Sequence, residues 1–495
     1  MSDKKWFNKG VELTKLGRYE DALKAFEKAI EKNPQDDKAW YAKGVALAKL
    51  GKHEEAIEAC EEAIEINSQF AKALFNKGVE LGELGRHEEA LKAYERAIEI
   101  NPQYAEAWVN KGVALSKLGR HDEAIEAYEK AIKINPQSEK AWFNKGFELG
   151  ELGKHEDALK AYEEAIEINP QFDIAWLNKG NELSKLERHE EALKACEKAT
   201  EINPQLAEAW YAKGIELAKL GRHEEAIEAY EKAIEINPQY AEAWFSKGFE
   251  LGELGKHEEA IEAYQKAIEI NPQYAEAWGN KGVELSELGK HEEALKVYEK
   301  AIEVNPQFDK AWFNKGVVLG KLGRHEEALR AYEKAIEMNR QYAKAWYAKG
   351  VALAKVGKHE ETKEAYEKAI EIDPKNALAY TNLGELFFKF GNLKEASEKI
   401  EKALNINGRL VSAWSLQGRI KIEQKAYDAA SEAFKKAMYL DIGNPIHFLW
   451  DIYAYYLKAE FTLDSKDKKY QEEISRIIRN LEKMNETLSK NQKQE

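Results

Sequence analysis

Apolar and polar residues follow one pattern along this chain, and the pattern recurs every 34 residues. In residues 207–240, a first apolar stripe with spacings of four, three and three comprises Trp210, Gly214, Leu217 and Leu220. A second stripe with helical spacing comprises Ala226, Ile227, Tyr230, Ala233, Ile234 and Ile236. Such spacings place each set on one face of a helix. Each copy of the pattern is therefore predicted to contain two amphipathic helices.

The residues between and after the two stripes predict where the helices end. Gly221 separates the stripes, and a glycine just past a helix end readily adopts the left-handed conformation. Glu224 and Glu225 open the second stripe, where negative charge is stabilised by the N-terminal end of the helix dipole. Pro238 closes the stripe because proline disfavours helical geometry for the residue before it. Each copy is thus predicted to fold as a helix hairpin.

The copies run without a gap from Asp3 to about Asn444, which makes thirteen repeats, with residues 3–36 as repeat 1. Each repeat carries an aromatic residue or leucine at place 4, glycine at place 8, alanine or a small substitute at places 20 and 27, and usually proline at place 32. A fixed period of this length is typical of stacked hairpins, none of which can bury its apolar face alone. One quasi-linear array is therefore expected.

The characteristic places of repeat 5 are occupied by Trp142, Gly146, Ala158, Tyr162, Ala165 and Pro170. These residues resemble the tetratricopeptide repeat, a 34-residue helix-turn-helix unit. The resemblance covers about nine tenths of the chain. It implies an all-α, right-handed superhelical solenoid whose first helices line a concave face. At place 7 most repeats have lysine, as at Lys145, where the family has leucine. We expect the stem of this lysine to lie along the helix, with its ammonium group in water.

Three segments are expected along the chain. Residues 3–444 form the array, residues 445–464 form a capping helix rich in aromatic residues, and residues 465–495 form an amphipathic helix with a frayed tail. A cap is expected because the outer face of the last hairpin has no neighbouring repeat to cover it. The amphipathic helix either packs on the last repeats or pairs with a second copy of the chain, and the sequence leaves both open.

Composition narrows the classes of partner. Asp and Glu number 89 against 75 Lys and Arg, which gives a net charge of −14 and disfavours binding to a nucleic-acid backbone. No stretch approaches the ~20 apolar residues of a membrane span, and the N-terminus lacks the apolar core of a signal peptide. We therefore expect neither nucleic acid nor a membrane as a partner, and we expect a cytoplasmic protein.

No catalytic, cofactor or metal site is expected. Ten histidines occupy the same turn place in ten repeats, where neighbours are separated by about 8–10 Å. Ligands of one zinc ion lie about 2.1 Å from it, so these histidines are interpreted as turn residues. Cys60 and Cys196 stand where other repeats have an aromatic residue and are interpreted as packing residues. No phosphate-binding glycine loop is present, and carboxylates are interpreted as solvated helix faces. The chain is therefore not expected to be an enzyme.

A row of asparagines is the first candidate for partner binding. By the family resemblance, place 6 faces the groove, and here it holds Asn8, Asn76, Asn110, Asn144, Asn178, Asn280, Asn314 and Asn382. An amide both donates and accepts hydrogen bonds, which suits an extended peptide backbone. The row resembles that of the superhelical repeat region of O-linked N-acetylglucosamine transferases, although no residues remain here for a catalytic domain. Asn144, Asn178, Asn280 and Asn314 are candidates for this contact, unless asparagine simply occupies the solvated side of the helix.

A basic stretch is the second candidate. Repeats 10 to 12 present lysines at places 2 and 13, namely Lys310, Lys321, Lys344, Lys355 and Lys389. Phe313 and Tyr347 at place 5 are expected to add apolar surface beside them. Together these residues suit an acidic segment that carries a hydrophobic anchor, with charge for steering and aromatics for residence time. The alternative is ordinary lysine on a solvated face.

The pattern as a whole predicts a protein-protein interaction scaffold that binds a partner peptide or segment along the concave face. Two alternatives remain open, a self-associating structural rod and a regulatory or targeting arm of a separately encoded enzyme. The sequence does not identify the partner, the oligomeric state or the biological process.

Overall fold

The computed structural model describes residues 2–440 together with Glu472, Ser475, Arg476 and Arg479. The chain divides into two compact units, Met1–Gly255 and Lys256–Glu495. The repeat pattern crosses this boundary without interruption, so the sequence pattern does not predict it. The boundary falls in the turn between the two helices of repeat 8.

Every regular element in the described part of the chain is an α-helix, and helices of 13 and 14 residues alternate. The first unit contains α1 (Asp3–Lys15), α2 (Tyr19–Lys32), α3 (Asp37–Lys49), α4 (His53–Ile66), α5 (Ala71–Glu83), α6 (His87–Ile100), α7 (Ala105–Lys117), α8 (His121–Ile134), α9 (Glu139–Glu151), α10 (His155–Ile168), α11 (Asp173–Lys185), α12 (His189–Ile202), α13 (Ala207–Lys219), α14 (His223–Ile236) and α15 (Ala241–Glu253). The second unit contains α16 (His257–Ile270), α17 (Ala275–Glu287), α18 (His291–Val304), α19 (Asp309–Lys321), α20 (His325–Met338), α21 (Ala343–Lys355), α22 (His359–Ile372), α23 (Ala377–Lys389), α24 (Leu393–Ile406), α25 (Val411–Glu423) and α26 (Tyr427–Leu440).

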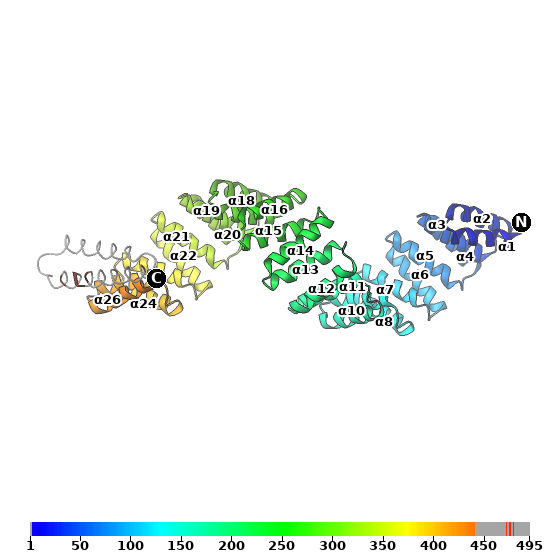
Figure 1. Cartoon of the computed structure of the whole chain (residues 1–495), viewed down its shortest axis with the longest axis horizontal. Helices are drawn as coiled ribbons and strands as arrows, with labels where there is room; N and C mark the ends of the chain where they lie inside the picture. The colour runs from blue at the N-terminus through cyan, green and yellow to red at the C-terminus, as the bar shows by residue number, and fades with distance from the viewer. Residues whose placement is uncertain (1, 441–471, 473–474, 477–478, 480–495) are drawn as a thin grey trace. The chain divides into compact units, whose positions relative to one another are not determined.

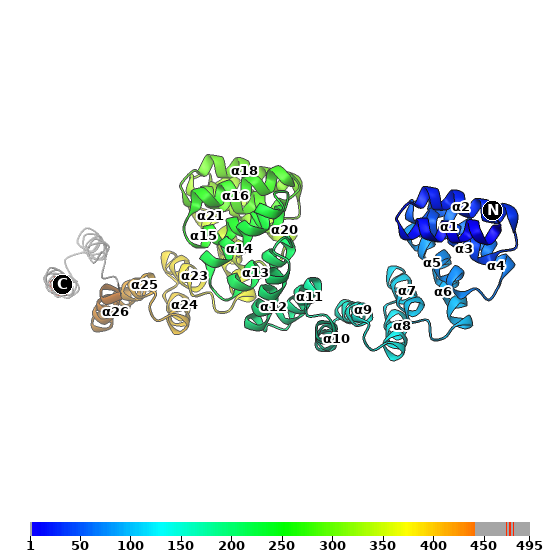
Figure 2. The ribbon, with the colours of Figure 1, turned by 45° about the vertical axis from the view of Figure 1, so that its right-hand side comes forward.

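Each odd-numbered helix, here helix A of its repeat, is followed by an even-numbered helix B. Within each unit, helix A packs against its own helix B, and helix B packs against helix A of the next repeat (Figure 1). Figure 2 shows this pairing clearly at the last two hairpins, where α23 lies beside α24 and α25 beside α26. The predicted helix hairpins are therefore confirmed. Helix B begins earlier than predicted, because the turn histidine is already its first residue, as at His223.

The predicted turn conformation is also confirmed. Gly221 has φ +74°, in the left-handed region, and the backbone N–H of Arg222 donates to the carbonyl of Leu217. Glu187 and Lys425 occupy the same turn place and adopt φ of 59° and 62° despite their side chains. Such a conformation is strained for a non-glycine residue, so the surrounding repeat imposes it.

The core of each hairpin is a close contact between helix A and helix B. A Cβ atom added to Gly214 would lie 2.5 Å from the ring of Tyr230, so only glycine fits there. Ala226 and Ala233 are fully buried at the same interface. In repeats 2 and 6, Cys60 and Cys196 replace the ring and are buried free thiols, as expected for packing residues.

Tryptophan at place 4 joins one repeat to the next. Trp210 packs with Ala243 and Trp244 of the following repeat, and its indole N–H donates to the carbonyl of Pro204 at 3.1 Å. The Nζ of Lys213 sits 5.3 Å from the Trp210 ring centroid. The ammonium group also lies 3.6 Å from Glu197 of the preceding repeat, so it is an inter-repeat ion pair and not merely a solvated charge.

The predicted capping helix, residues 445–464, lies outside the described residues, as does most of the predicted amphipathic helix. Of that second segment, Arg476 is described, and its Nη2 donates to Asp428 of α26 at 2.9 Å. Capping and self-pairing by these segments stay predictions. None of the helices in the described part combines the length and apolar character that crossing a lipid bilayer requires.

The glycine contacts yield a stability prediction with a matched control. Gly214→Ala should lower the free energy of unfolding by about 1–3 kcal/mol, because its methyl group overlaps the Tyr230 ring. Gly82→Ala should raise it by up to about 1 kcal/mol, because the nearest atom lies 3.9 Å away and alanine favours the helix. Denaturant unfolding of both variants checks this, and a loss of similar size at the two sites would contradict the contact.

Candidate functional site

The A helices of repeats 5, 6 and 7 enclose a groove of about 460 Å³, called here the first-unit groove. Its lining comprises Phe147, Gly150, Glu151, Tyr162, Asn178, Asn181, Glu182, Ser184, Lys185, Ala212, Ile215, Glu216 and Lys219. The groove brings together one predicted site residue, Asn178, with a second amide one helical turn later, Asn181. Phe147 lines its edge and is 45 % exposed, so it offers apolar surface there.

Both lysines that line the first-unit groove are paired with a glutamate of the same lining. Glu182 accepts from Lys185 Nζ through Oε1 at 2.8 Å, and its Oε2 lies 2.6 Å from Nδ1 of His155. Glu216 is placed in the same way, 3.3 Å from Lys219 Nζ and 2.9 Å from a histidine of the preceding repeat. The positive charge of this groove is therefore neutralised, which suits an uncharged segment better than an acidic one.

The glutamate at place 10 of helix A organises this arrangement. In six repeats it is almost buried, as at Glu148 with 1 % exposure, and it meets the histidine that opens helix B of the preceding repeat. The interpretation of carboxylates as solvated surface was wrong for these six residues. A signal existed in the sequence, because His and Glu recur 27 residues apart, but only the stacking of hairpins brings the two side chains together.

Repeats 10 to 12 have an apolar residue at place 10, namely Val318, Ala352 and Leu386. Lys321, Lys355 and Lys389 lie three residues later on the same helices and are exposed. Among the described residues none of these three lysines has an ion pair, whereas Lys185 has a carboxylate three residues before it. The Nδ1 atoms of His291 and His359 are likewise buried without a hydrogen-bond partner in the described part. Because these repeats lack a glutamate at place 10, the charge of the lysine three residues later is not compensated by a carboxylate at that place.

Two of these lysines share a cavity of about 250 Å³ between α21, α22 and α23, called here the basic pocket. Its lining comprises Val351, Ala354, Lys355, His359, Thr362, Tyr366, Asn382, Glu385, Leu386 and Lys389. The single carboxylate in this lining, Glu385, is held by two hydrogen bonds from Arg419 at 3.0 and 3.1 Å. The pocket therefore has apolar walls and an excess of positive charge at its mouth.

Phe313 and Tyr347 expose less surface than the sequence predicts. The Phe313 ring packs 5.9 Å from Tyr332 and 5.0 Å from Tyr342, centroid to centroid. Tyr347 packs 5.9 Å from Tyr366 in the same way. Both rings are half-buried in contacts between helices, so their apolar area is largely consumed by the fold. Neither lines the basic pocket.

Part of the predicted asparagine row is engaged in hydrogen bonds within the fold. Asn382 donates to the hydroxyls of Tyr347 at 3.2 Å and Tyr366 at 3.4 Å, so its amide is engaged within the fold. Burial raises the pKa of Tyr366 to about 12, which keeps this hydroxyl protonated. The other candidates, Asn144, Asn280 and Asn314, are partly exposed on helix A. Lys310 and Lys344 are exposed near the starts of α19 and α21, outside the basic pocket.

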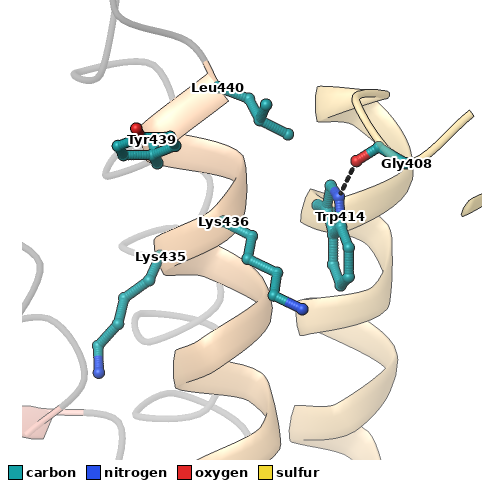
Figure 3. Close-up of a pocket in the computed structure, with 6 residues that line it drawn as sticks. All are labelled: Gly408, Trp414, Lys435, Lys436, Tyr439 and Leu440. Carbon is teal, nitrogen blue, oxygen red and sulfur yellow. Dashed lines mark hydrogen bonds between the residues drawn. The ribbon is translucent and has the colours of Figure 1, made fainter.

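A third cavity, of about 510 Å³, lies at the end of the last described hairpin. Figure 3 shows Lys436 pointing across it toward Trp414, with Tyr439 and Leu440 at its rim. The Lys436 ammonium lies 4.2 Å from the Trp414 ring centroid, and the indole N–H donates to Gly408 at 2.8 Å. In interior repeats the tryptophan at this place packs against the next repeat. We therefore interpret this cavity as the surface on which a further helical element would pack against repeat 13.

Models of known families match the chain from residue 7 to residue 445. Residues 7–70 and 75–139, and then 139–172, 174–206 and 207–240, match tetratricopeptide repeat models. The chain is a tetratricopeptide repeat protein. Residues 240–445 of the array match the model described as cilia and flagella-associated protein 70 C-terminal domain. The residues of the basic pocket lie within that second match.

Solved structures similar to the tetratricopeptide array include those of YrrB, MamA and the complex Cut9-Hcn1. YrrB, described as a protein of this family with an unusual peptide-binding site, is 27% identical, with 39% of this chain and 98% of that chain covered and a TM-score of 0.35. MamA from Desulfovibrio magneticus RS-1 is 23% identical, with 34% and 97% covered and a TM-score of 0.33. The APC/C hetero-tetramer Cut9-Hcn1 is 14% identical, with 85% and 96% covered and a TM-score of 0.44. No curated protein sequence matches the chain significantly.

One lysine of the array is predicted to be unusually reactive. Lysines at place 7 pair with a glutamate of the preceding repeat, as Lys315 does with Glu299 at 2.9 Å, but Lys281 meets Gln265 instead. Burial lowers the pKa of Lys281, so a larger fraction of this amine is neutral at a given pH. Competitive acetylation at pH 8, read by mass spectrometry, should modify Lys281 faster than Lys315. Gln265→Glu should raise the pKa of Lys281 and slow its reaction, and an unchanged rate would contradict this cause.

Proposed function

We propose that this tetratricopeptide array is a protein-binding scaffold whose main site is the basic face of repeats 10 to 12. Its ligand is an acidic segment that carries a hydrophobic anchor. The observation that carries the proposal is the uncompensated charge of Lys321, Lys355 and Lys389, which follows from the missing glutamate at place 10. Lys310, Lys344, Phe313 and Tyr347 flank this face, and the half-buried aromatic rings contribute at its edge.

Charge distinguishes this face from the equivalent surface elsewhere in the array. In repeats 2 to 4 the residues at place 13 alternate in sign, as Lys49, Glu83 and Lys117, whereas repeats 10 to 12 present three lysines in succession. Like charges on neighbouring repeats raise the local potential and speed the encounter with an acidic partner. We therefore place the main site in the second compact unit.

The basic pocket supplies the position for the anchor. Val351 and Leu386 form apolar walls, and Lys355 and Lys389 stand at the same cavity. A volume of about 250 Å³ holds one large apolar side chain, so a residue next to an acidic one fits both features. Burial of such a side chain contributes about 1.5–3 kcal/mol to the free energy of binding. The anchor therefore determines the dissociation rate more than the lysines do.

The first-unit groove supports a second candidate, in which Asn144 and Asn178 hold the backbone of an uncharged segment beside Phe147. Its internal ion pairs favour a neutral ligand over an acidic one.

The family match over residues 240–445 supports a further proposal, that the partner belongs to a ciliary or flagellar assembly. No catalytic role is proposed, and the tetratricopeptide families matched here are typically non-catalytic scaffolds. A self-associating rod and an arm of a separate enzyme remain the alternative functions.

The basic face is tested by charge reversal. A fluorescent nine-residue peptide of glutamates with one central phenylalanine should bind the intact chain, and the same peptide with lysines should not. Lys321→Glu combined with Lys355→Glu should raise the dissociation constant about tenfold or more at low salt. The salt dependence of the remaining binding should flatten, because fewer charges are screened. Fluorescence anisotropy measures both, and circular dichroism should show unchanged helix content.

The matched control reverses Lys49 and Lys117, which occupy the same place and also follow an alanine at place 10. This variant has the same net charge and should keep most of the binding. If the Lys321 and Lys355 variant binds as well as the control variant, the basic face is not the site. Loss of binding on changing Asn144 and Asn178 to alanine would assign the function to the first-unit groove instead.

A further inference from the structure

Six bonds between a histidine and a glutamate connect successive repeats. Each joins Nδ1 of the first residue of helix B to Oε2 of the place-10 glutamate in the next helix A, over 2.6–2.9 Å. The pairs are His53 with Glu80, His121 with Glu148, His155 with Glu182, His189 with Glu216, His223 with Glu250, and His257 with Glu284. Every one of them crosses a junction between neighbouring repeats.

The surroundings of each pair make it sensitive to charge. The glutamate side chains are 1–11% exposed, and the histidine rings are 27–35% exposed. A nearly buried carboxylate interacts more strongly with a cation than a solvated one does. In a linear array, a bond between neighbours adds directly to the interface term that holds two repeats together. Protonation of the histidine therefore acts on stacking and not within one hairpin.

The pair in repeats 7 and 8 shows the direction of the effect. The hydrogen bond to Glu250 raises the pKa of His223, and the charges of Glu250 and Glu253 from α15 and Glu224 from α14 act in the same direction, while burial opposes them. A histidine whose folded pKa exceeds its unfolded value, about 6.5, contributes its full stabilisation below that pH. The contribution is lost as the pH rises through the folded pKa. The junction is thus stronger in mild acid than at alkaline pH.

Other junctions in the same chain lack the carboxylate and serve as internal comparisons. In the helix A that follows His87, His291, His325 and His359, place 10 holds Ala114, Val318, Ala352 and Leu386. Four consecutive junctions of the first unit, from repeat 4 to repeat 8, have the pair, whereas the three from repeat 9 to repeat 12 do not. Glu182 and Glu216 of these pairs also line the first-unit groove. The pairs therefore gather around one candidate surface and are missing around the basic pocket.

We propose that the pair of His223 and Glu250 is a pH-responsive latch between repeats 7 and 8. Protonation of His223 tightens the stacking of these two repeats, whose side chains meet over 2.6 Å. Repeat 7 supplies Ala212, Ile215, Glu216 and Lys219 to the first-unit groove, so the latch acts next to one wall of that groove. Junctions without a carboxylate at place 10 have no such pair. A change of pH between about 6 and 8.5 then alters the stiffness of this junction.

Hydrogen exchange of the full chain at pH 6.0 and pH 8.5 tests the latch, after correction for the intrinsic pH dependence of amide exchange. Opening of α15 should be about threefold to tenfold less frequent at pH 6.0. His223→Gln keeps a donor for Glu250 but cannot titrate, so it should abolish this difference. His87→Gln is the matched control in the same unit and should preserve it. An equal pH difference at α15 in wild type and His223→Gln overturns the proposal.

Transplanting the glutamate provides an independent test. In the wild type, α7 should show no pH-dependent change in opening, because Ala114 faces His87. Ala114→Glu should create a threefold to tenfold difference at α7, since six other junctions accommodate glutamate at this place. The histidine titrations, followed by nuclear magnetic resonance, should then show a raised pKa for His87 in this variant. A wild-type α7 that responds to pH as strongly as α15, or a folded Ala114→Glu variant with no response, contradicts the latch.

Discussion

The contact between a glycine on helix A and a ring on helix B is the constraint on which the rest of the array depends. At Gly214 a Cβ would approach the Tyr230 ring to 2.5 Å, and Gly316 stands at the same distance from Tyr332. Only the absence of a side chain allows the two helices to come this close, and interiors packed at crystal density do not yield to an extra methyl group. The close contact sets the geometry of each hairpin, and thereby which places of helix A remain for the groove.

Once the hairpins are stacked, the residue at place 10 controls two properties at once. A glutamate there, as at Glu182, binds the histidine of the preceding repeat and neutralises the lysine three residues later on its own helix. An apolar residue there, as at Leu386, packs into the core, and the histidine and the lysine then lack that carboxylate. Stacking and groove charge are therefore coupled through a single position. A repeat array can vary its binding surface in this way without changing its fold.

This coupling gives the two candidate surfaces different characters. The first-unit groove combines amides, an exposed phenylalanine and internally paired charges, and its walls carry the histidine–glutamate pairs. The basic pocket combines apolar walls with lysines that the described residues leave without ion pairs. The Nδ1 atom of His359, in the lining of this pocket, is buried without a hydrogen-bond partner among the described residues. Such an unsatisfied group costs stability, and functional sites are where such costs are expected.

Features that depend on neighbours in sequence could be predicted from the sequence alone. The helix hairpins, the left-handed turn at Gly221 and the packing roles of Cys60 and Cys196 follow from spacing and local backbone preference, and the structure confirms them. These features are local because a helix stripe, a glycine turn and a proline stop each involve residues within a few positions. The basic run formed by the lysines of repeats 10 to 12 could also be predicted, because the residue type at each repeated place is known from the sequence.

Features that depend on contact between repeats were decided only by the tertiary structure. His155 and Glu182 are 27 residues apart, and their meeting depends on how one hairpin is rotated against the next. Within one repeat, too, packing half-buries Phe313 against Tyr332 and Tyr342, where periodicity alone predicted free apolar surface. Helical spacing indicates which face of one helix a residue occupies. It does not indicate which residues of the neighbouring helix lie opposite that face. The sequence by itself therefore determined the repeat, its hairpin and its charge pattern, whereas the tertiary structure decided which of those charges are paired and which stay available to a partner.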